Sequence, residues 1–176
     1  MRPGWAFAPV LGGAVAHAPF LRFDLAPRLK RPLDERRFGA NKTWRGALAM
    51  SGGTLGATLA LHRVPAYRER LPEELRTAGP RRHGALLGAA VVLGELPNSA
   101  FKRRLGIGPG ERASSPLGVV LAIHDQADFV LGAWPLLAPV WRMSARELCE
   151  AFAVVAGVHL AVNLAGYALG ARTAPL

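Results

Sequence analysis

Cysteine and aromatic side chains are scarce in this chain of 176 residues. The single cysteine, Cys149, excludes an internal disulfide, and no metal-ligand spacing surrounds it. Aromatic residues make up only 7% of a sequence that is 51% hydrophobic, so the apolar mass consists of Ala, Leu, Val and 20 Gly. Small residues are enriched where transmembrane helices pack closely, although soluble helical domains can share this composition. The length suits one domain, which we expect to cover residues 1–176.

Acidic residues are also few, since 12 Asp and Glu stand against 22 Lys and Arg, giving a net charge of +10. Such a charge points to nucleic acid, an anionic membrane face or a phosphorylated substrate. The basic residues cluster in 22–45, 63–82 and 102–112, and the stretches between them are nearly free of charge. This alternation is typical of membrane proteins and disfavours nucleic acid as a partner. A soluble basic protein is the alternative.

Five apolar segments predict an all-α, polytopic integral membrane protein, a compact bundle of about five transmembrane helices. They are Trp5–Leu21, Gly46–Leu61, Gly84–Ala100, Leu117–Trp141 and Ala151–Ala171. A helix needs about 20 apolar residues to cross a bilayer, with a range of about 17–25. The last two segments meet this length, and the first three lie near its lower limit. The first also resembles a signal peptide, because Arg2 precedes the apolar run and Ala16-His17-Ala18 resembles a cleavage site.

The basic residues also predict the orientation in the cell membrane. With five spans, 22–45 and 101–116 share one side with the C-terminus, and this side carries thirteen Lys and Arg against nine on the other. The positive-inside rule therefore places 22–45 and 101–116 in the cytoplasm, and with them the polar chemistry.

The strongest functional signal is a pair of carboxylates inside the fourth apolar segment, in the sequence His124-Asp125-Gln126-Ala127-Asp128-Phe129. Asp125 and Asp128 are three residues apart, so they share one face of a helix. Ionisable groups within a membrane span are costly and face a cavity, a partner or a metal. Two adjacent carboxylates repel each other unless a cation neutralises them. The pair predicts either a metal site or buried Arg or Lys partners.

A second polar stripe lies at the end of the third apolar segment. Glu95, Ser99 and Lys102 fall on one helical face by their spacing. A carboxylate, a hydroxyl and an ammonium together suit a phosphate–metal site. Pro97 is expected to interrupt this helix, as in the broken membrane helices near binding sites. The alternative is that Lys102 belongs to a basic flank without a catalytic role.

A third signal is the basic, glycine-bounded stretch 36–46. It is not a P-loop, because Asn41 stands before Lys42 where that motif needs Gly. We expect a flexible cationic loop at the membrane surface that holds a polyphosphate, or alternatively contacts anionic lipid. The Gly-rich loop Leu105–Pro116 is expected to close over a nucleotide. His159 and Asn163, four residues apart, are expected to pack or orient substrate rather than bind metal.

Three ordered motifs resemble those of the CDP-archaeol synthase family, which belongs with the phosphatidate cytidylyltransferases. The motifs are FGANKTWRG, LGELPNSAFKRRLGIGPG and HDQADFVLGA, with further likeness in AHAPFL and HLAVNLAGYALGARTAPL. The resemblance implies a bundle of about five membrane helices and a Mg²⁺-dependent reaction in which CTP and a lipid phosphate give a CDP-lipid and pyrophosphate.

The family's motifs fall on particular residues of this chain. The resemblance matches the first motif to Lys42, Thr43, Trp44, Arg45 and Gly46, the second to Ser99, Lys102 and Arg103, and the third to Asp125, Gln126 and Asp128. The chain departs from the family's pattern at Ala40, Glu95, Asn98 and Ala100. Glu95 keeps the charge of the usual Asp on a longer side chain. These departures bear on metal geometry and on the choice of substrate.

The expected mechanism needs no special nucleophile, because a lipid phosphate is already anionic at neutral pH. Metal ions and cationic side chains bring the two anions together and stabilise the leaving pyrophosphate. The expected metal ligands, for Mg²⁺, are Glu95, Asp125 and Asp128, and the expected catalytic residues are Lys102, Asp125 and Asp128. The expected substrate-binding residues are Asn41, Lys42, Thr43, Arg45, Ser99, Arg103 and Gln126. The alternative function is a small transporter or lipid-binding protein that uses the same acids as an ion site.

Overall fold

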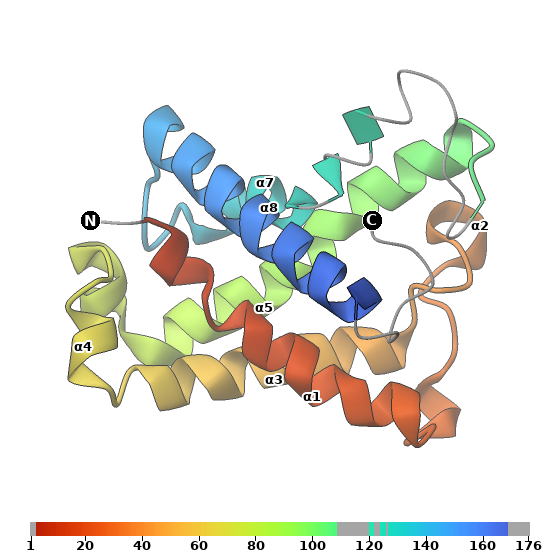
Figure 1. Ribbon diagram of the computed structural model, residues 1–176, viewed down its shortest axis with the longest axis horizontal. Helices are drawn as coiled ribbons and strands as arrows, with labels where there is room; N and C mark the ends of the chain where they lie inside the picture. The colour runs from red at the N-terminus through yellow and green to blue at the C-terminus, as the bar shows by residue number, and fades with distance from the viewer. Residues whose placement is uncertain (1–2, 109–119, 122–123, 126, 169–176) are drawn as a thin grey trace.

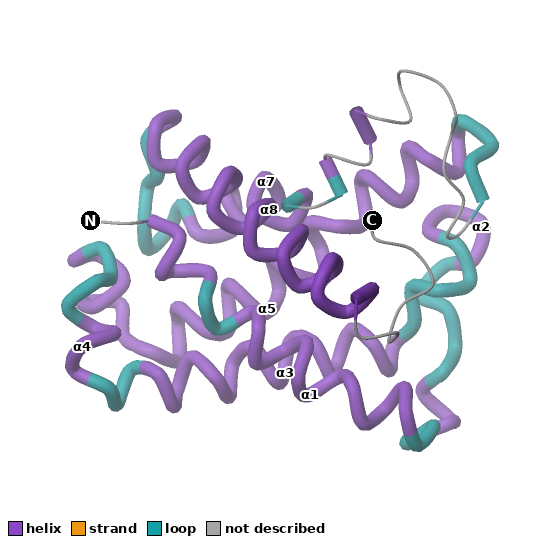
Figure 2. Tube along the Cα trace, viewed as in Figure 1, coloured by secondary structure: helices purple, strands orange, loops and turns teal. Residues whose placement is uncertain are grey.

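The computed structural model describes residues 3–108, 120–121, 124–125 and 127–168, and these residues form helices joined by loops (Figures 1 and 2). The helices in chain order are η1 (Pro3–Phe7), α1 (Val10–Arg22), η2 (Pro27–Leu29), α2 (Glu35–Phe38), α3 (Trp44–Leu61), α4 (Pro65–Arg68), α5 (Glu73–Arg104), α7 (Asp128–Leu137) and α8 (Ala145–Ala168). Over this part of the chain the only extended pairing is an isolated bridge between Pro32 and Thr43. The all-α prediction is confirmed.

Within the described residues, three helical stretches are long and apolar enough to cross a membrane, namely Pro3–Arg22, Glu73–Arg104 and Ala145–Leu164. They overlap the first, third and fifth predicted spans. The second predicted span is the 18-residue helix α3, and the fourth contains the ten-residue apolar helix α7. The polytopic membrane architecture is supported, whereas the number of five spans stays a prediction.

Close helix packing rests on small residues, as the composition indicated. Helix α3 packs between α1 and α5, and α5 packs in turn against α7. A Cβ atom added to Gly132 of α7 would lie 2.1 Å from the Cα of Gly94 in α5. Only glycine permits two backbones to approach this closely. The contact fixes the spacing between α5, which carries Glu95 and Asn98, and α7, which begins at Asp128.

Helix α5 bends at a glycine and not at the predicted proline. Gly79 has φ 77°, a left-handed conformation that glycine adopts without steric cost, and the long helix is kinked there. Pro97 lies inside the helix, which continues to Arg104. The expected interruption at Pro97 is therefore wrong, and the residues around it stay on one continuous helical face.

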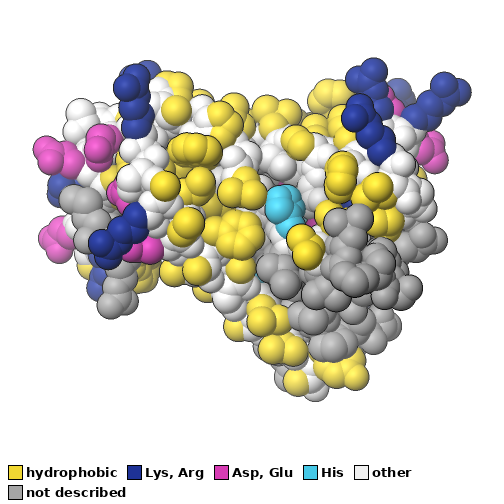
Figure 3. All heavy atoms as spheres, turned by 90° about the horizontal axis from the view of Figure 1, so that it is seen from above, with side chains coloured by type: hydrophobic (Ala, Val, Ile, Leu, Met, Phe, Trp, Pro, Cys, Tyr) yellow, Lys and Arg dark blue, Asp and Glu magenta, His cyan; other side chains and the backbone are white. Residues whose placement is uncertain are grey.

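On the face shown in Figure 3, the charged side chains gather at the two ends of the molecule's long axis, and hydrophobic side chains predominate between them. One end holds α2 and the C-terminal turns of α5, and the other holds α4 (Figure 1). The basic stretch 22–45 and the basic end of α5 thus lie together, as the predicted topology requires. An apolar surface between two polar ends suits a protein that spans a bilayer.

Candidate functional site

The start of α7 and the residues before it carry a cluster of three potential metal ligands. One ligand atom each of His124, Asp125 and Asp128 lies within 4.8 Å of the others. Asp128, the first residue of α7, is 8% exposed, and its Oδ1 accepts a hydrogen bond of 2.8 Å from the N–H of Phe129. The Nδ1 atom of His124 is buried and has no hydrogen-bond partner among the described residues. A buried polar atom without a partner favours a further ligand at this position.

Two side chains of α5 contact the carboxylates of this cluster. The Nδ2 atom of the buried Asn98 donates hydrogen bonds to Asp125 Oδ1 at 2.6 Å and to Asp128 Oδ2 at 2.9 Å. One turn further along α5, the ammonium of Lys102 forms an ion pair with Asp125. The sequence predicted either a metal or buried cationic partners for the two carboxylates, and the structure supplies Lys102. Asn98, noted only as a departure from the family's pattern, is the residue that links both carboxylates.

His124 is a member of the cluster that sequence reasoning passed over, because the five histidines lack ligand spacing among themselves. The available signal was its position beside Asp125 and four residues before Asp128, although α7 begins only at Asp128 and the three residues do not share one helix. Glu95, predicted as a third metal ligand, is not part of this cluster. Its carboxylate instead forms an ion pair with Lys42.

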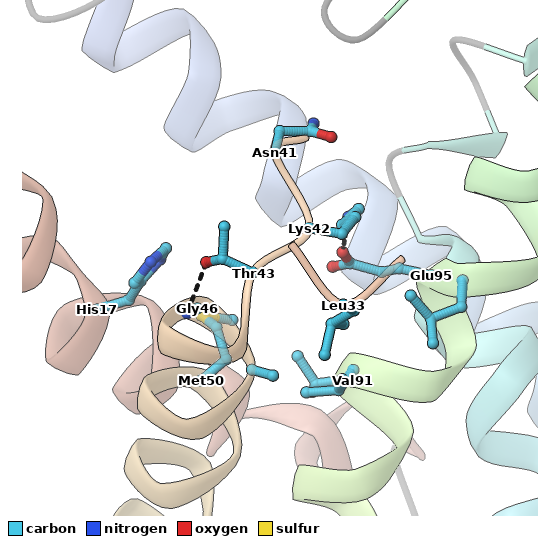
Figure 4. A pocket seen from close by; sticks show the side chains of 12 residues that line it. His17, Leu33, Asn41, Lys42, Thr43, Gly46, Met50, Val91 and Glu95 are labelled. Carbon is cyan, nitrogen blue, oxygen red and sulfur yellow. Dashed lines mark hydrogen bonds and ion pairs between the residues drawn. The ribbon is translucent and has the colours of Figure 1, made fainter. Parts of the chain in front are cut away.

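Lys42 and Glu95 line a cavity of about 190 Å³ that is open to the surface (Figure 4). The cavity is walled by His17 of α1, by the loop 41–43, and by α3 and α5. Among the predicted substrate-binding residues it brings together Asn41, Lys42 and Thr43. In this small cavity, called the polar cavity below for its ion pair, Lys42 of the loop meets the carboxylate of Glu95 between walls that are otherwise largely apolar.

The position of Thr43 follows from local helix chemistry. Thr43 is the N-cap of α3, and its hydroxyl oxygen accepts a hydrogen bond from the N–H of Gly46 at 3.1 Å. This bond satisfies one of the amide donors that every helix start leaves unpaired. The bond also fixes the direction from which the chain, with Lys42, enters α3. The predicted role of Thr43 in substrate binding thus comes with a structural role.

Arg45 is held by the loop that follows α1. Its Nη1 donates to Asp24 Oδ1 at 2.5 Å and to the carbonyl oxygen of Leu25 at 3.1 Å, and the side chain is buried. Hydrogen bonds from Arg45 and from Lys30 hold the pKa of Asp24 below its ordinary value. Arg45 does not line the cavity that contains Lys42. Its predicted contact with CTP stays a prediction, and the structure gives Arg45 a bracing role for the 22–45 segment.

The remaining predicted residues lie on α5 or outside the described residues. Ser99 and Arg103 flank Lys102 on the last turns of α5, and the Nε atom of Arg103 is buried with no hydrogen-bond partner among the residues described. Gln126 lies outside the described residues, as does most of the loop Leu105–Pro116. Asn163 of α8 is buried, and both it and His159 have interactions with neighbouring groups.

The helical fold, the polar ends and the acid–cation cluster at the α5–α7 contact define a polytopic membrane protein with a polar site between helices. The comparisons with known proteins specify the family. The family model for CarS-like CDP-archaeol synthase matches residues 29–176, and the chain belongs to this family.

Curated relatives agree with this assignment. The chain is 34% identical over 188 residues to the CDP-archaeol synthase of Aeropyrum pernix, covering 97% of this chain and 95% of the relative. It is 33% identical over 155 residues to the CDP-archaeol synthase of Methanosarcina acetivorans, an alignment that covers 81% of this chain and 84% of the relative. It is 42% identical over 90 residues to the CDP-archaeol synthase of Methanocella arvoryzae, an alignment that covers 48% of this chain and 47% of the relative. No solved structure matches the chain at a comparable level of significance.

Proposed function

We propose that this chain transfers a cytidylyl group from CTP to a membrane lipid phosphate, releasing a CDP-lipid and pyrophosphate in phospholipid biosynthesis. The observation that carries the proposal is the contact of Asn98 and Lys102 with Asp125 and Asp128. It joins the second and third family motifs in one polar site. The residues 1–176 act as one domain in the cell membrane, and the end of the molecule that holds α2 faces the cytoplasm.

The two carboxylates fit a divalent ion. Carboxylate oxygens are the protein ligands that Mg²⁺ prefers, and one or two carboxylates beside substrate phosphates are its usual setting. Asp125 and Asp128 would hold it, and when bound the ion supplies positive charge beside the phosphate oxygens. Imidazole suits other metals better. The buried Nδ1 of His124, which has no partner among the described residues, is therefore assigned to a hydrogen bond with a bound substrate.

The cationic side chains of the chain position the two anionic substrates. An oxygen of the lipid phosphate attacks the α-phosphorus of CTP, the bond to the β-phosphate oxygen breaks, and pyrophosphate leaves. Lys102, now paired with Asp125, is within reach of a phosphate bound beside that carboxylate. Lys42 of the polar cavity and Arg103 of α5 neutralise the remaining phosphate charge. Charges fixed in a water-poor site stabilise the transition state more strongly than the same charges do in water.

The direct test incubates the purified protein with labelled CTP, Mg²⁺ and lipid phosphates that differ in linkage and chain type. The expected products are a labelled CDP-lipid and an equal amount of pyrophosphate, both dependent on the lipid phosphate. Absence of a labelled lipid with every lipid phosphate would contradict the proposal and favour a transporter that uses the same acids as an ion site.

A further inference from the structure

Two buried histidines meet where α3 leads into α4, at the end of the molecule opposite α2 (Figure 1). His62 is the C-cap of α3 and His83 belongs to α5, and the two residues are 7% and 0% exposed. The Nε2 atom of His62 lies 3.2 Å from Nδ1 of His83. The Nε2 atom of His83 lies 3.0 Å from the carbonyl oxygen of Ala6 in η1. This chain of contacts ties η1 to α3 and α5 and has no part in the proposed reaction.

The hydrogen atoms of this chain of contacts run in one direction. A carbonyl oxygen only accepts hydrogen bonds, so Nε2 of His83 donates to Ala6. The neutral ring of His83 then carries a lone pair on Nδ1, which accepts a hydrogen bond from Nε2 of His62. Both rings are neutral in this arrangement. If both rings were protonated, two N–H groups would face each other and the contact between the histidines would break.

The surroundings of the pair do not stabilise a positive charge. Among the described residues, the ring of His62 packs edge-on against Tyr67 of α4, and burial raises the pKa of the Tyr67 hydroxyl, which is therefore neutral. Burial, and then the positive charge of Arg68, lower the pKa of His62. The segment η1 and the first two turns of α1 contain no ionisable residue. The charged residues next to the two histidines in the sequence are all basic, namely Arg63, Arg81 and Arg82.

We propose that His62 and His83 form an acid-sensitive latch that holds η1 against α3 and α5. This inference goes beyond the proposed function and does not depend on it. Because the folded protein disfavours a proton on His62, the contribution of this residue to stability is present above its unfolded pKa of about 6.5. The contribution is lost as the pH falls towards the folded pKa. Since η1 leads into α1, which forms part of the wall of the polar cavity, the latch fixes one end of that wall.

A metal ion is the competing explanation for the two facing nitrogens. Metal–nitrogen bonds of about 2.0–2.1 Å in a tetrahedral zinc site place neighbouring ligands roughly 3.3 Å apart. The hydrogen bond from His62 to His83 accounts for the observed 3.2 Å without an ion. Within the described part of the chain, the one group of three potential ligands is the His124 cluster, so no third such ligand joins this pair. The hydrogen-bonded latch is therefore the simpler reading, and the experiment separates the two.

Thermal unfolding of the purified protein in detergent, with and without EDTA, tests the latch. Between about pH 7.5 and about pH 5 the unfolding temperature is expected to fall by about 2–4 °C, which corresponds to about one pKa unit for a chain of this size. His62→Gln keeps an N–H donor near the position of Nε2 and takes up no proton. This variant is expected to lose about half of the fall, because one of the two imidazoles remains. His159→Gln, at an exposed histidine of α8, is the matched control and is expected to keep the whole fall.

A second variant leaves both histidines in place. Arg68 is exposed, and Arg68→Gln removes the positive charge that disfavours a proton on His62. The fall in unfolding temperature is therefore expected to be smaller than in the unsubstituted protein, with the fold intact. An undiminished fall in both His62→Gln and Arg68→Gln would overturn the proposal.

Hydrogen exchange locates the change in the molecule. At about pH 5.5, the amides of residues 4–8 and 62–71 are expected to exchange faster in the unsubstituted protein than in His62→Gln. At about pH 7.5, where the latch is closed, the two proteins are expected to exchange equally. Faster exchange spread evenly over all helices would contradict a local latch. A fall in unfolding temperature that disappears with EDTA would also overturn the proposal, because that result assigns the two imidazoles to a metal ion.

Discussion

The Nδ2 atom of Asn98 lies 2.9 Å from Oδ2 of Asp128, across the contact between α5 and α7. The same nitrogen donates to Asp125, so one amide sets the distance between two carboxylates. We expect Asn98→Ala to raise the Mg²⁺ concentration needed for half-maximal turnover by about 10- to 100-fold, as loss of a ligand-orienting partner does. Metal titration of CTP turnover measures this. Phe101→Ala, an exposed change on the same helix, is the control, and equal metal dependence of both variants would argue against the role of Asn98.

The two carboxylates themselves are expected to be indispensable. Asp125→Asn or Asp128→Asn is expected to lower kcat by about 10²-fold or more, because each removes a charge that holds the ion opposite the phosphates. The measurement is turnover of labelled CTP, with tryptophan fluorescence to show that the variants fold. Glu150→Gln removes a carboxylate that is paired with Arg146 on the surface, and it is expected to keep full activity. Near-normal activity in both Asp variants would remove the proposed metal site.

Lys42 is expected to contribute to nucleotide affinity. Lys42→Met removes the cation of the polar cavity and leaves Glu95 without its ion-pair partner. Loss of a charged hydrogen bond costs about 1.5–3 kcal/mol, so KM for CTP is expected to rise about 10- to 100-fold. Steady-state kinetics at saturating lipid phosphate measures the change. Lys30→Met, which breaks an exposed ion pair with Asp24, is the matched control, and a similar KM in both variants would exclude a contact between Lys42 and the nucleotide.

The contact between α5 and α7 is expected to tolerate no added methyl group. Gly132→Ala would place a Cβ against the backbone of Gly94. Overpacking of this kind costs about 1–3 kcal/mol and would shift Asp128 relative to Asn98. The temperature of thermal unfolding in detergent and the rate of CTP turnover are both expected to fall. Gly157→Ala on α8, where an added Cβ meets nothing within 4 Å, should leave both unchanged, and equal behaviour of the two variants would contradict the packing argument.

The ion pair between Arg45 and Asp24 is expected to give stability that depends on pH. Because Arg45 and Lys30 lower the pKa of Asp24 below its ordinary value of 3.8, the folded state favours the ionised carboxylate. Its contribution is fully present above the unfolded pKa and is lost as the pH falls through the folded one. The difference in thermal stability between the unsubstituted protein and Asp24→Asn should be constant above about pH 5 and shrink below pH 4. A difference that persists undiminished in acid would show that Asp24 acts without its charge.

Several features of the fold and the site could be predicted from residue order alone. The apolar segments gave the helices, because a run of apolar residues must be buried in lipid or protein wherever it lies. The spacing of Asp125 and Asp128 indicated a shared site, and the two carboxylates do meet at Asn98. The expected shared helical face is wrong, because α7 begins at Asp128 and Asp125 lies in the turn before it. The basic flanks indicated which loops lie together. The interruption predicted at Pro97 was wrong, because sequence alone does not distinguish a proline that a packed helix tolerates from a proline that ends the helix.

Sequence by itself determined the helical membrane class, the acid pair and the cationic loops of this protein, since each is a property of a short stretch of chain. Only the tertiary structure decided which charges meet. Asn98 bridges the carboxylates, Lys102 pairs with Asp125, and Glu95 turns to Lys42. These partners lie between 23 and 53 residues apart in the chain. These contacts depend on how closely glycines such as Gly94 and Gly132 let the helices approach. A short stretch of sequence does not show that distance.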